Sequence, residues 1–214
     1  MMLSSGAMGE GISDWNRFER LTPFRVRDVL LVASHFDHYL LEESGYLAEI
    51  MQEEYSDLNL SQAPRIIHSP DARDALRLLR AREFDLVITM TRVGEMDVKA
   101  FGTEAKRVIE GLPVVMLSHN TRELATLSAG DGIDRIFVWT GDSRILLSIC
   151  KLLEDERNVE NDVRDGDVQV ILLIEDSRRF YSAYLPLLYT QLVNQTTRLM
   201  GEGGNLHEKL LRLR

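Results

Sequence analysis

Short apolar runs alternate with amphipathic stretches along most of this sequence of 214 residues. Five of the runs are apolar almost throughout, which predicts strands that are buried on both faces of a parallel sheet. The stretches between them space apolar residues about 3.6 apart and predict helices that cross over from one strand to the next. The predicted strands are Val29–Ala33, Arg65–His68, Leu86–Met90, Val114–Leu117 and Ile136–Trp139.

The predicted helices complete five strand–helix units. The second begins after Asp71 in Ser-Pro-Asp, a cap-like start, and the third uses Val98, Phe101 and Ala105 as its apolar stripe. The first is expected at about 39–55, the fourth at 122–129 and the fifth at about 142–153. The pattern therefore predicts an α/β fold with a five-stranded, doubly wound parallel sheet, which we assign to residues 25–155.

The segments outside this unit differ in composition. Residues 1–24 mix Gly, Ser and Met with polar residues without any period, and we expect a flexible or vector-derived lead. Residues 156–167 are rich in acids and poor in apolar residues, which predicts an exposed linker. A new apolar run then opens residues 168–214, followed by a long helix from Arg178 to about Met200 that contains Pro186.

An internal repeat explains this last segment. Leu172-Leu173-Ile174 follows Leu30-Leu31-Val32 at a distance of 142 residues, and the same offset brings Tyr181 onto Tyr39. Residues 168–214 thus look like the first strand and helix of an incomplete second copy. One strand and one helix cannot close a core. We expect them to dock on the first domain, to pair with another chain as in a homodimer, or to remain partly disordered.

Charge and cysteine content narrow the classes of partner. The net charge of −9 and pI of about 5.1 argue against nucleic acid and against an anionic membrane surface, since both require a basic face. No apolar run reaches the length of a membrane span. The single cysteine, Cys150, cannot form an internal disulfide, which favours a cytoplasmic protein, and its apolar neighbours predict a buried, inert thiol.

Residues 25–155 resemble a bacterial response-regulator receiver in the runs LLVASHFD, FDLVITMTRVGEMD, LPVVMLSHN and IDRIFVWTG. The resemblance implies a flavodoxin-like sheet of order 2-1-3-4-5. Receivers carry two acids after strand one, a phosphorylated Asp at the end of strand three, a Ser or Thr after strand four and a Lys after strand five. The acids hold Mg²⁺, and the Lys and hydroxyl stabilise the transferring oxygens. Here the corresponding residues are Ala33, Ser34, Met90, Ser118 and Trp139.

Only Ser118 retains the family's chemistry at these positions. Methionine cannot form an acyl phosphate, and a site without carboxylates has little to hold Mg²⁺. The resemblance therefore implies a pseudo-receiver without a cofactor in the first domain. Trp139 is expected to fill the vacated pocket beside Met90, although an exposed interface anchor is the alternative.

Unlike the first domain, the second copy keeps acidic residues at the position of the receiver's acid pair. Its IEDS run places Glu175 and Asp176 at the acid pair of a receiver, so the resemblance implies possible Mg²⁺ binding in an intact second domain.

A separate polar group follows strands one and four of the first domain. His35, Asp37, His38 and His119 could form a metal or anion site, but their spacing matches no metal signature, and solvent-exposed loop residues are the favoured interpretation.

Three functional hypotheses follow. The first is a non-catalytic regulatory module that contacts a protein partner or its own downstream domains. The resemblance to receivers implies that the contact is made through the face of the fourth helix, fifth strand and fifth helix. The second is a phosphoryl-accepting signalling protein whose active receiver is the second copy. The third rests on a further resemblance: paired receivers of this kind are associated with large bacterial proteins similar to phosphoenolpyruvate synthase or pyruvate phosphate dikinase, which would make the chain their N-terminal regulatory part.

Overall fold

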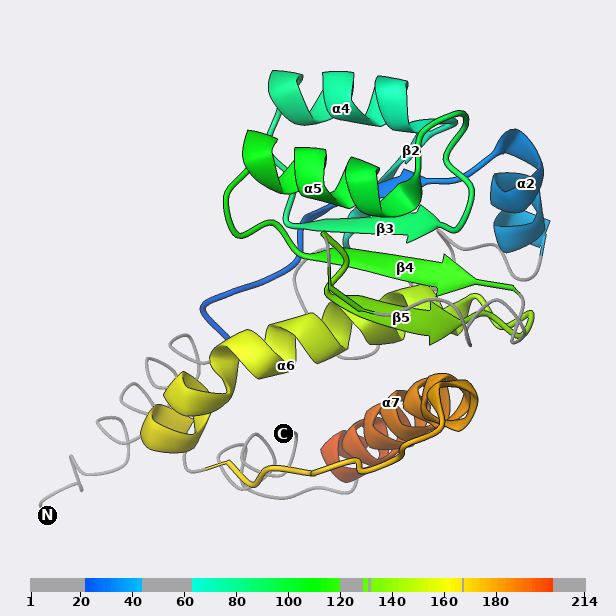
Figure 1. Cartoon of the computed structure of the whole chain (residues 1–214). Coiled ribbons are helices and arrows are strands. Elements are labelled where there is room, and N and C mark those ends of the chain that lie inside the picture. The colour runs from blue at the N-terminus through cyan, green and yellow to red at the C-terminus, as the bar shows by residue number, and fades with distance from the viewer. Residues whose placement is uncertain (1–21, 44–62, 120–128, 131, 167, 202–214) are drawn as a thin grey trace, which may run out of the picture.

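The computed structural model describes residues 22–43, 63–119, 129–130, 132–166 and 168–201. Its centre is a five-stranded parallel sheet of order β2-β1-β3-β4-β5 (Figure 1), as the sequence predicts. Each predicted strand is present with its bounds shifted by one residue at most. The strands are β1 (Asp28–Val32), β2 (Arg65–Ser69), β3 (Leu86–Met90), β4 (Val114–Ser118) and β5 (Arg135–Val138).

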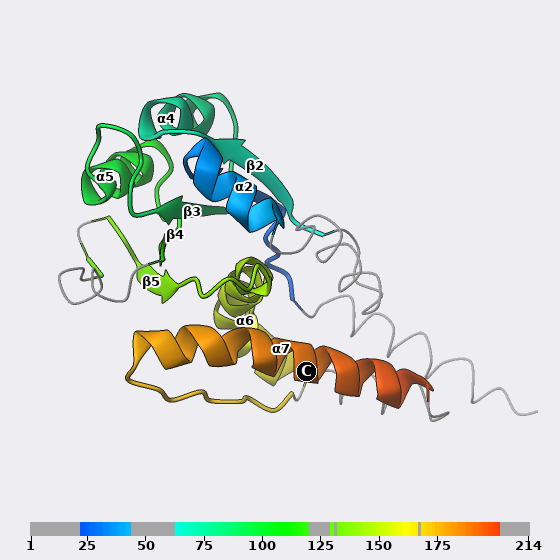
Figure 2. The same ribbon diagram turned by 90° about the vertical axis from the view of Figure 1, so that its right-hand side faces the viewer.

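Helices cover both faces of the sheet (Figures 1 and 2), which explains the continuous apolar runs of the strands. One face carries α4 (Ala72–Ala81) and α5 (Val98–Val108), and the other carries α2 (His35–Glu43) and α6 (Arg144–Gly166). Alternate strand residues enter opposite layers: Leu30 lies in the core under α4 and α5, whereas Leu31 lies in the core under α2 and α6. The two cores are thus separated by the sheet itself.

Local sequence signals fix the ends of α4 and α5. Asp71 caps α4 by accepting a hydrogen bond from the Asp74 N–H, at 2.9 Å. Asp97 caps α5 through the N–H groups of Lys99 and Ala100. Within α5, Gly102 permits a close approach: a Cβ there would lie 2.5 Å from the carbonyl oxygen of Gly132 in the turn before β5.

The acidic segment after Leu153 is helical, so the prediction of an exposed linker at 156–167 is wrong. Helix α6 continues to Gly166 because one stripe of its polar residues is buried rather than solvated. The stripe consists of Glu154, Asn158 and Asp162, spaced four residues apart and at most 8% exposed. It lies on one face of the helix, as that spacing requires.

The buried stripe binds the chain just before β1. Its carboxyl and amide oxygens accept the N–H groups of alternate residues: Val26 at 2.9 Å, Phe24 at 2.9 Å and Thr22 at 2.8 Å. Residues 22–24 therefore belong to the domain, and the predicted lead of 1–24 extends three residues too far. Residues 1–21 lie outside the described part.

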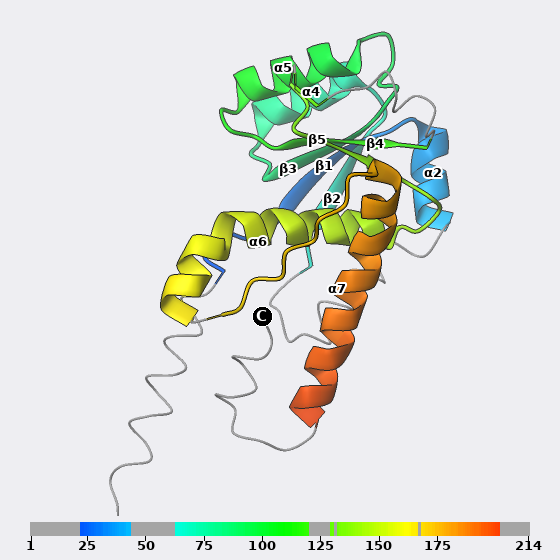
Figure 3. The same ribbon diagram turned by 60° about the horizontal axis from the view of Figure 1, so that its bottom comes forward.

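After α6, the chain forms no strand between residues 168 and 177, contrary to the prediction for the second copy. A strand needs a neighbour for its backbone groups, and none of the described strands pairs with this segment. The long helix is confirmed as α7 (Arg178–Gly201) with Pro186 inside it. Helix α7 lies beside β5 and crosses α6 (Figure 3).

Two predicted features cannot be compared with the structure. The fourth helix at 122–129 and the first helix beyond residue 43 fall outside the described residues. Among the described helices, none has both the length and the apolar character of a membrane span.

Candidate functional site

The carboxyl ends of β1, β3, β4 and β5 meet at one edge of the sheet, where doubly wound folds bind ligands. Three of the predicted site residues join one hydrophobic cluster there: Ala33, Met90 and Trp139. Met90 is 1% exposed and Trp139 is 8% exposed. This part of the edge offers apolar atoms to a ligand instead of carboxylates.

Ser118 is fully buried at the end of β4, and its carbonyl oxygen accepts the Trp139 N–H at 2.9 Å. Among the described residues, the indole Nε1–H of Trp139 has no hydrogen-bond partner. The ring of Trp139 contacts the His119 ring edge-on, with centroids 4.7 Å apart. Trp139 and Met90 are buried in the same hydrophobic cluster, and the filling of a former phosphate pocket by Trp139 stays a prediction.

Ser34 starts α2. Its hydroxyl donates to Asp37 Oδ2 at 2.7 Å and accepts the Asp37 N–H at 3.1 Å, which is the geometry of an N-cap. Asp37 also accepts from His119 Nε2 at 3.1 Å. Ser34, Asp37 and His119 thus form a hydrogen-bonded chain from the end of β1 to the end of β4.

The interpretation as a solvent-exposed loop residue is wrong for Asp37, which belongs to α2, whereas His119 is exposed in the loop after β4. The ends of β1 and β4 are not adjacent in the sheet, yet helix α2 carries Asp37 within reach of His119. The side chain of Asp37 is 19% exposed, so the pair is partly shielded from water. Sequence spacing gave no signal for the contact, because it depends on where α2 leaves β1.

A second histidine group lies at the β2 side of the edge. His68 donates from Nε2 to the Ala33 carbonyl oxygen at 2.7 Å, and the His38 ring lies 3.9 Å from the His68 ring. Burial, with His68 nearby, lowers the pKa of His38, which favours its neutral form. Across the described ranges, no three His, Cys, Asp or Glu side chains are grouped so that they could hold a metal.

Glu175 and Asp176 precede α7, as the repeat predicts. The Glu175 carboxylate accepts the Ser177 N–H at 2.8 Å, and the Ser177 hydroxyl accepts the Phe180 N–H at the start of the helix. Glu175 therefore supports the turn into α7. Two neighbouring carboxylates leave most of an octahedral Mg²⁺ shell to be supplied by other ligands.

Helix α7 covers the open side of β5 and part of α6, which we call the β5–α6 surface (Phe137, Val138, Arg144 and Asp155). The Ser182 hydroxyl accepts the Val138 N–H at 2.9 Å, a backbone donor on the edge strand. Leu185 is 2% exposed within the core under α6. The Tyr189 hydroxyl donates to Asp155 Oδ2 at 2.7 Å, and Tyr181 packs on Phe137.

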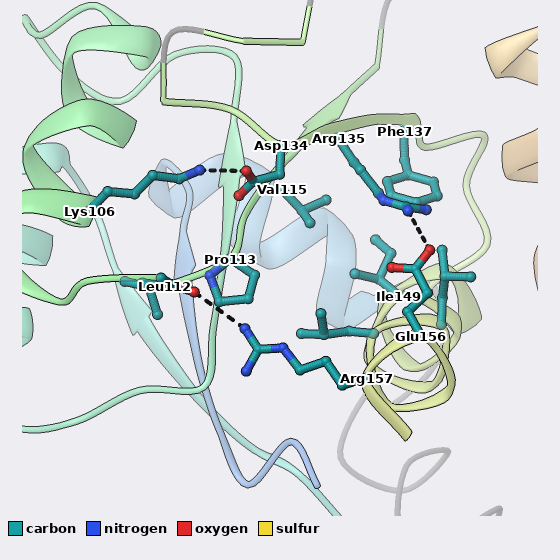
Figure 4. A pocket seen from close by; sticks show the side chains of 13 residues that line it. Lys106, Leu112, Pro113, Val115, Asp134, Arg135, Phe137, Ile149, Glu156 and Arg157 are labelled. Carbon is teal, nitrogen blue, oxygen red and sulfur yellow. Dashed lines mark hydrogen bonds and ion pairs between the residues drawn. The ribbon is translucent and has the colours of Figure 1, made fainter. Parts of the chain in front are cut away.

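A hollow of about 280 Å³ opens at the other end of β4 and β5 (Figure 4). Its floor is apolar, and its charges are engaged: Lys106 pairs with Asp134, and Arg135 pairs with Glu156. Arg157 donates to the Gly111 carbonyl oxygen at 3.3 Å. An anionic ligand would compete with carboxylates already bound to these cations.

Comparisons with known proteins gave matches among solved structures alone. No family model and no curated protein matches the chain. Among solved structures, it is similar to a CheY-like response-regulator receiver domain protein from Methanospirillum hungatei JF-1, with 18% identity, 63% of this chain and 98% of that chain covered, and a TM-score of 0.48. It is also similar to the chemotaxis response regulator CheY4 of Vibrio cholerae, with 17% identity, coverage of 60% and 98%, and a TM-score of 0.46.

A third similar structure is the response regulator TrrA from Thermotoga maritima in complex with Mg²⁺ and BeF. It shares 18% identity, with coverage of 59% and 98% and a TM-score of 0.46.

Proposed function

We propose that this chain is a non-catalytic regulatory module of the receiver fold, which works through protein contacts rather than phosphoryl transfer. The observation that carries the proposal is that Ala33, Met90 and Trp139, at the edge where a receiver would hold Mg²⁺ and phosphate, are buried members of the hydrophobic core on the α2 and α6 side of the sheet. Phosphoryl transfer relies on metal ions and cations that neutralise charge on the transferring oxygens. These three residues supply neither.

The remaining polar groups at the edge support the same function. Asp37 is a carboxylate close to the end of β1, but it already accepts hydrogen bonds from Ser34 and His119. Its use as a Mg²⁺ ligand would require both contacts to change. Asp37 is therefore a structural link between α2 and β4 in this proposal.

The β5–α6 surface is the proposed site of protein contact. It belongs to the face of the fourth helix, fifth strand and fifth helix, through which receivers contact their partners. The surface already binds one helix, because α7 lies on it. The surface combines an edge backbone donor at Val138, apolar contact and a carboxylate acceptor at Asp155. This combination suits an amphipathic helix with a small hydroxyl residue.

The test is a titration with Mg²⁺ and beryllofluoride, a phosphoryl mimic, followed through backbone amide shifts. We expect no saturable shifts at Met90, Ser118 or Trp139, and no covalent phosphate after incubation with acetyl phosphate. Saturable shifts at these residues, or a stable acyl phosphate in the first domain, would overturn the proposal.

The same titration addresses Mg²⁺ at the second copy. Glu175 and Asp176 are the residues that would hold the ion, and we expect at most weak binding in this chain because Glu175 supports the turn into α7. Shifts confined to 175–177 under Mg²⁺ alone would favour the alternative function, a phosphoryl-accepting second receiver.

A further inference from the structure

The β5–α6 surface recognises α7 through contacts that depend only on local chemistry. Ser182 meets the Val138 N–H, Leu185 enters the core, and Tyr189 reaches Asp155. Nothing in these contacts requires that α7 belong to the same chain. A second copy of the protein carries an identical α7, which the surface would bind equally well.

The connection between α6 and α7 is unusual. Residues 168–177 run from the end of α6 to the start of α7 without pairing to any described strand (Figures 2 and 3). Leu173 packs against the core, whereas Leu172 and Ile174 are 77% and 83% exposed. Val170 and Ile171 are 60% and 59% exposed. This segment has the apolar, β-branched composition of a strand, but it pairs with none of the described strands.

Exposed apolar residues of this kind are unfavourable in a monomer and typical of an interface. An exposed chain with unpaired backbone groups is also a template for pairing with a second chain. The segment is therefore both the tether that would allow α7 to move to another molecule and a surface that gains from a partner.

We propose that two copies of this chain exchange α7, so that each β5–α6 surface binds the helix of the other copy. The two 168–177 segments then pair antiparallel about the twofold axis. The docking contacts of α7 are the same before and after exchange, so they cancel. The gain comes from the apolar residues of the two segments, which cover one another.

The spacing of the exposed apolar residues favours one register. With Leu172 on the twofold axis, Val170 of each copy lies opposite Ile174 of the other, and these outward residues share one face. The net charge of −9 on each copy opposes association, so dimerisation should strengthen as salt is added.

This inference names the partner for the surface on which the proposed function rests, and it deepens that function. If it holds, α7 and an external helical partner compete for the β5–α6 surface. Because α7 covers this surface both in the monomer and in the exchanged dimer, an external helix has to displace α7 in either state.

Sedimentation over a range of protein and salt concentrations tests the association. We expect a monomer–dimer equilibrium that salt shifts towards dimer. Replacing both Leu172→Asp and Ile174→Asp should weaken it by about tenfold or more, because two large apolar side chains per copy lose their burial. The matched control is Gln191→Asp with Asn194→Asp, which adds the same charge at exposed polar positions of α7, outside the 168–177 segment, and should change dimerisation much less.

Crosslinking distinguishes exchange from simple association. The double variant Asp155→Cys, Tyr189→Cys is treated with a short bismaleimide, which joins α6 to the α7 that lies on it. In the isolated dimer we expect covalent dimers, and each single variant should give none. A monomer at every concentration, or a dimer in which the crosslink stays within one chain, overturns the proposal.

Circular dichroism and thermal melting of each variant establish that it folds before its assembly is measured. The beryllofluoride titration separates the two proposals: a monomer that ignores beryllofluoride overturns only the exchange. An exchanged dimer that binds beryllofluoride at Met90, Ser118 and Trp139 overturns only the proposed function.

Discussion

The side-chain amide of Asn158 bonds both backbone groups of Phe24, accepting its N–H at 2.9 Å and donating to its carbonyl oxygen at 2.7 Å. A neighbouring strand would satisfy the same two groups in the same way. Asn158 on α6 therefore substitutes for a strand at this point. The Arg157 guanidinium also lies 4.3 Å from the centre of the Phe24 ring, which fixes the side chain as well as the backbone.

Asn158→Ala should lower the free energy of unfolding by about 1–3 kcal/mol, because two backbone groups of Phe24 lose their partner in a partly buried place. Urea unfolding at neutral pH measures the change. Glu160→Ala, at an exposed position of the same helix, is the control and should stay within about 0.5 kcal/mol of the parent. Equal effects of the two substitutions would contradict the role of Asn158.

Ser182→Ala should weaken the docking of α7. The Val138 N–H then lacks its acceptor, at a cost of about 1–3 kcal/mol. Hydrogen exchange at the Val138 amide is the measurement, and we expect faster exchange. Ser148→Ala is the control. It removes another buried helical serine, whose hydroxyl donates to the Arg144 carbonyl oxygen, and it should leave the exchange rate of the Val138 amide unchanged. Unchanged protection in Ser182→Ala would refute the contact.

Met90→Asp should not restore phosphorylation and should destabilise the domain by about 3 kcal/mol or more. The new carboxyl would sit in an apolar cluster, 1% exposed, without a positive partner at the position of Trp139. Met96→Asp, at an exposed methionine in the loop after β3, is the control and should be tolerated. Thermal melting compares the two, and a stable Met90→Asp protein that accepts phosphate would contradict us.

The stability contributed by Asp28 should depend on pH. Its hydrogen bond from Arg65 at 2.7 Å, supported by Arg82 at 2.8 Å, holds the pKa of Asp28 below its usual value. A lowered pKa in the folded state means that the stabilisation is present above the unfolded pKa of about 3.9 and is lost as the pH falls through the folded value.

Asp28→Asn should therefore reduce stability by up to about 1 kcal/mol at neutral pH, and the difference should vanish in acid. Urea unfolding between neutral pH and strong acid measures it. Glu104→Gln, in a surface pair on α5, is the control and should show little change at either end. A difference between Asp28→Asn and the parent that persists in acid would count against this explanation.

Cys150 should not react with thiol reagents in the native protein. It is 1% exposed, and burial, with Glu154 nearby, raises the pKa of its thiol well above the usual range. Labelling with a maleimide under native conditions should proceed only as fast as the domain opens, and it should be rapid in denaturant. Fast native labelling would show that the region between α6 and the sheet opens locally.

The apolar periodicity predicts the five strands and helices α4 and α5, because each of those signals lies within one element. It places the first helix too late, at about residue 39, whereas α2 begins at His35. It does not predict the length of α6. Glu154, Asn158 and Asp162 are polar residues that are buried because their partners lie about 130 residues earlier, and no local pattern reports such a partner. A prediction from composition alone therefore places these buried polar residues in solvent.

The contact between Asp37 and His119 was missed for the same kind of reason. The two residues are 82 positions apart and follow strands that are not neighbours in the sheet. The run at 168–177 shows the opposite error: its sequence is that of a strand, but a strand exists only when another chain segment completes its hydrogen bonds.

The tie between residues 22–26 and α6 has a consequence for biosynthesis. The residues of the domain that leave the ribosome first form hydrogen bonds with residues that leave it late. The Thr22 N–H bonds the Asp162 side chain, and the Phe24 N–H bonds the Asn158 side chain. The start of β1 thus remains unsatisfied while most of the sheet is already made. Folding of a nascent chain can be completed only after α6 has emerged in full, so a translational pause before residue 162 would leave an opened first strand exposed to chaperones.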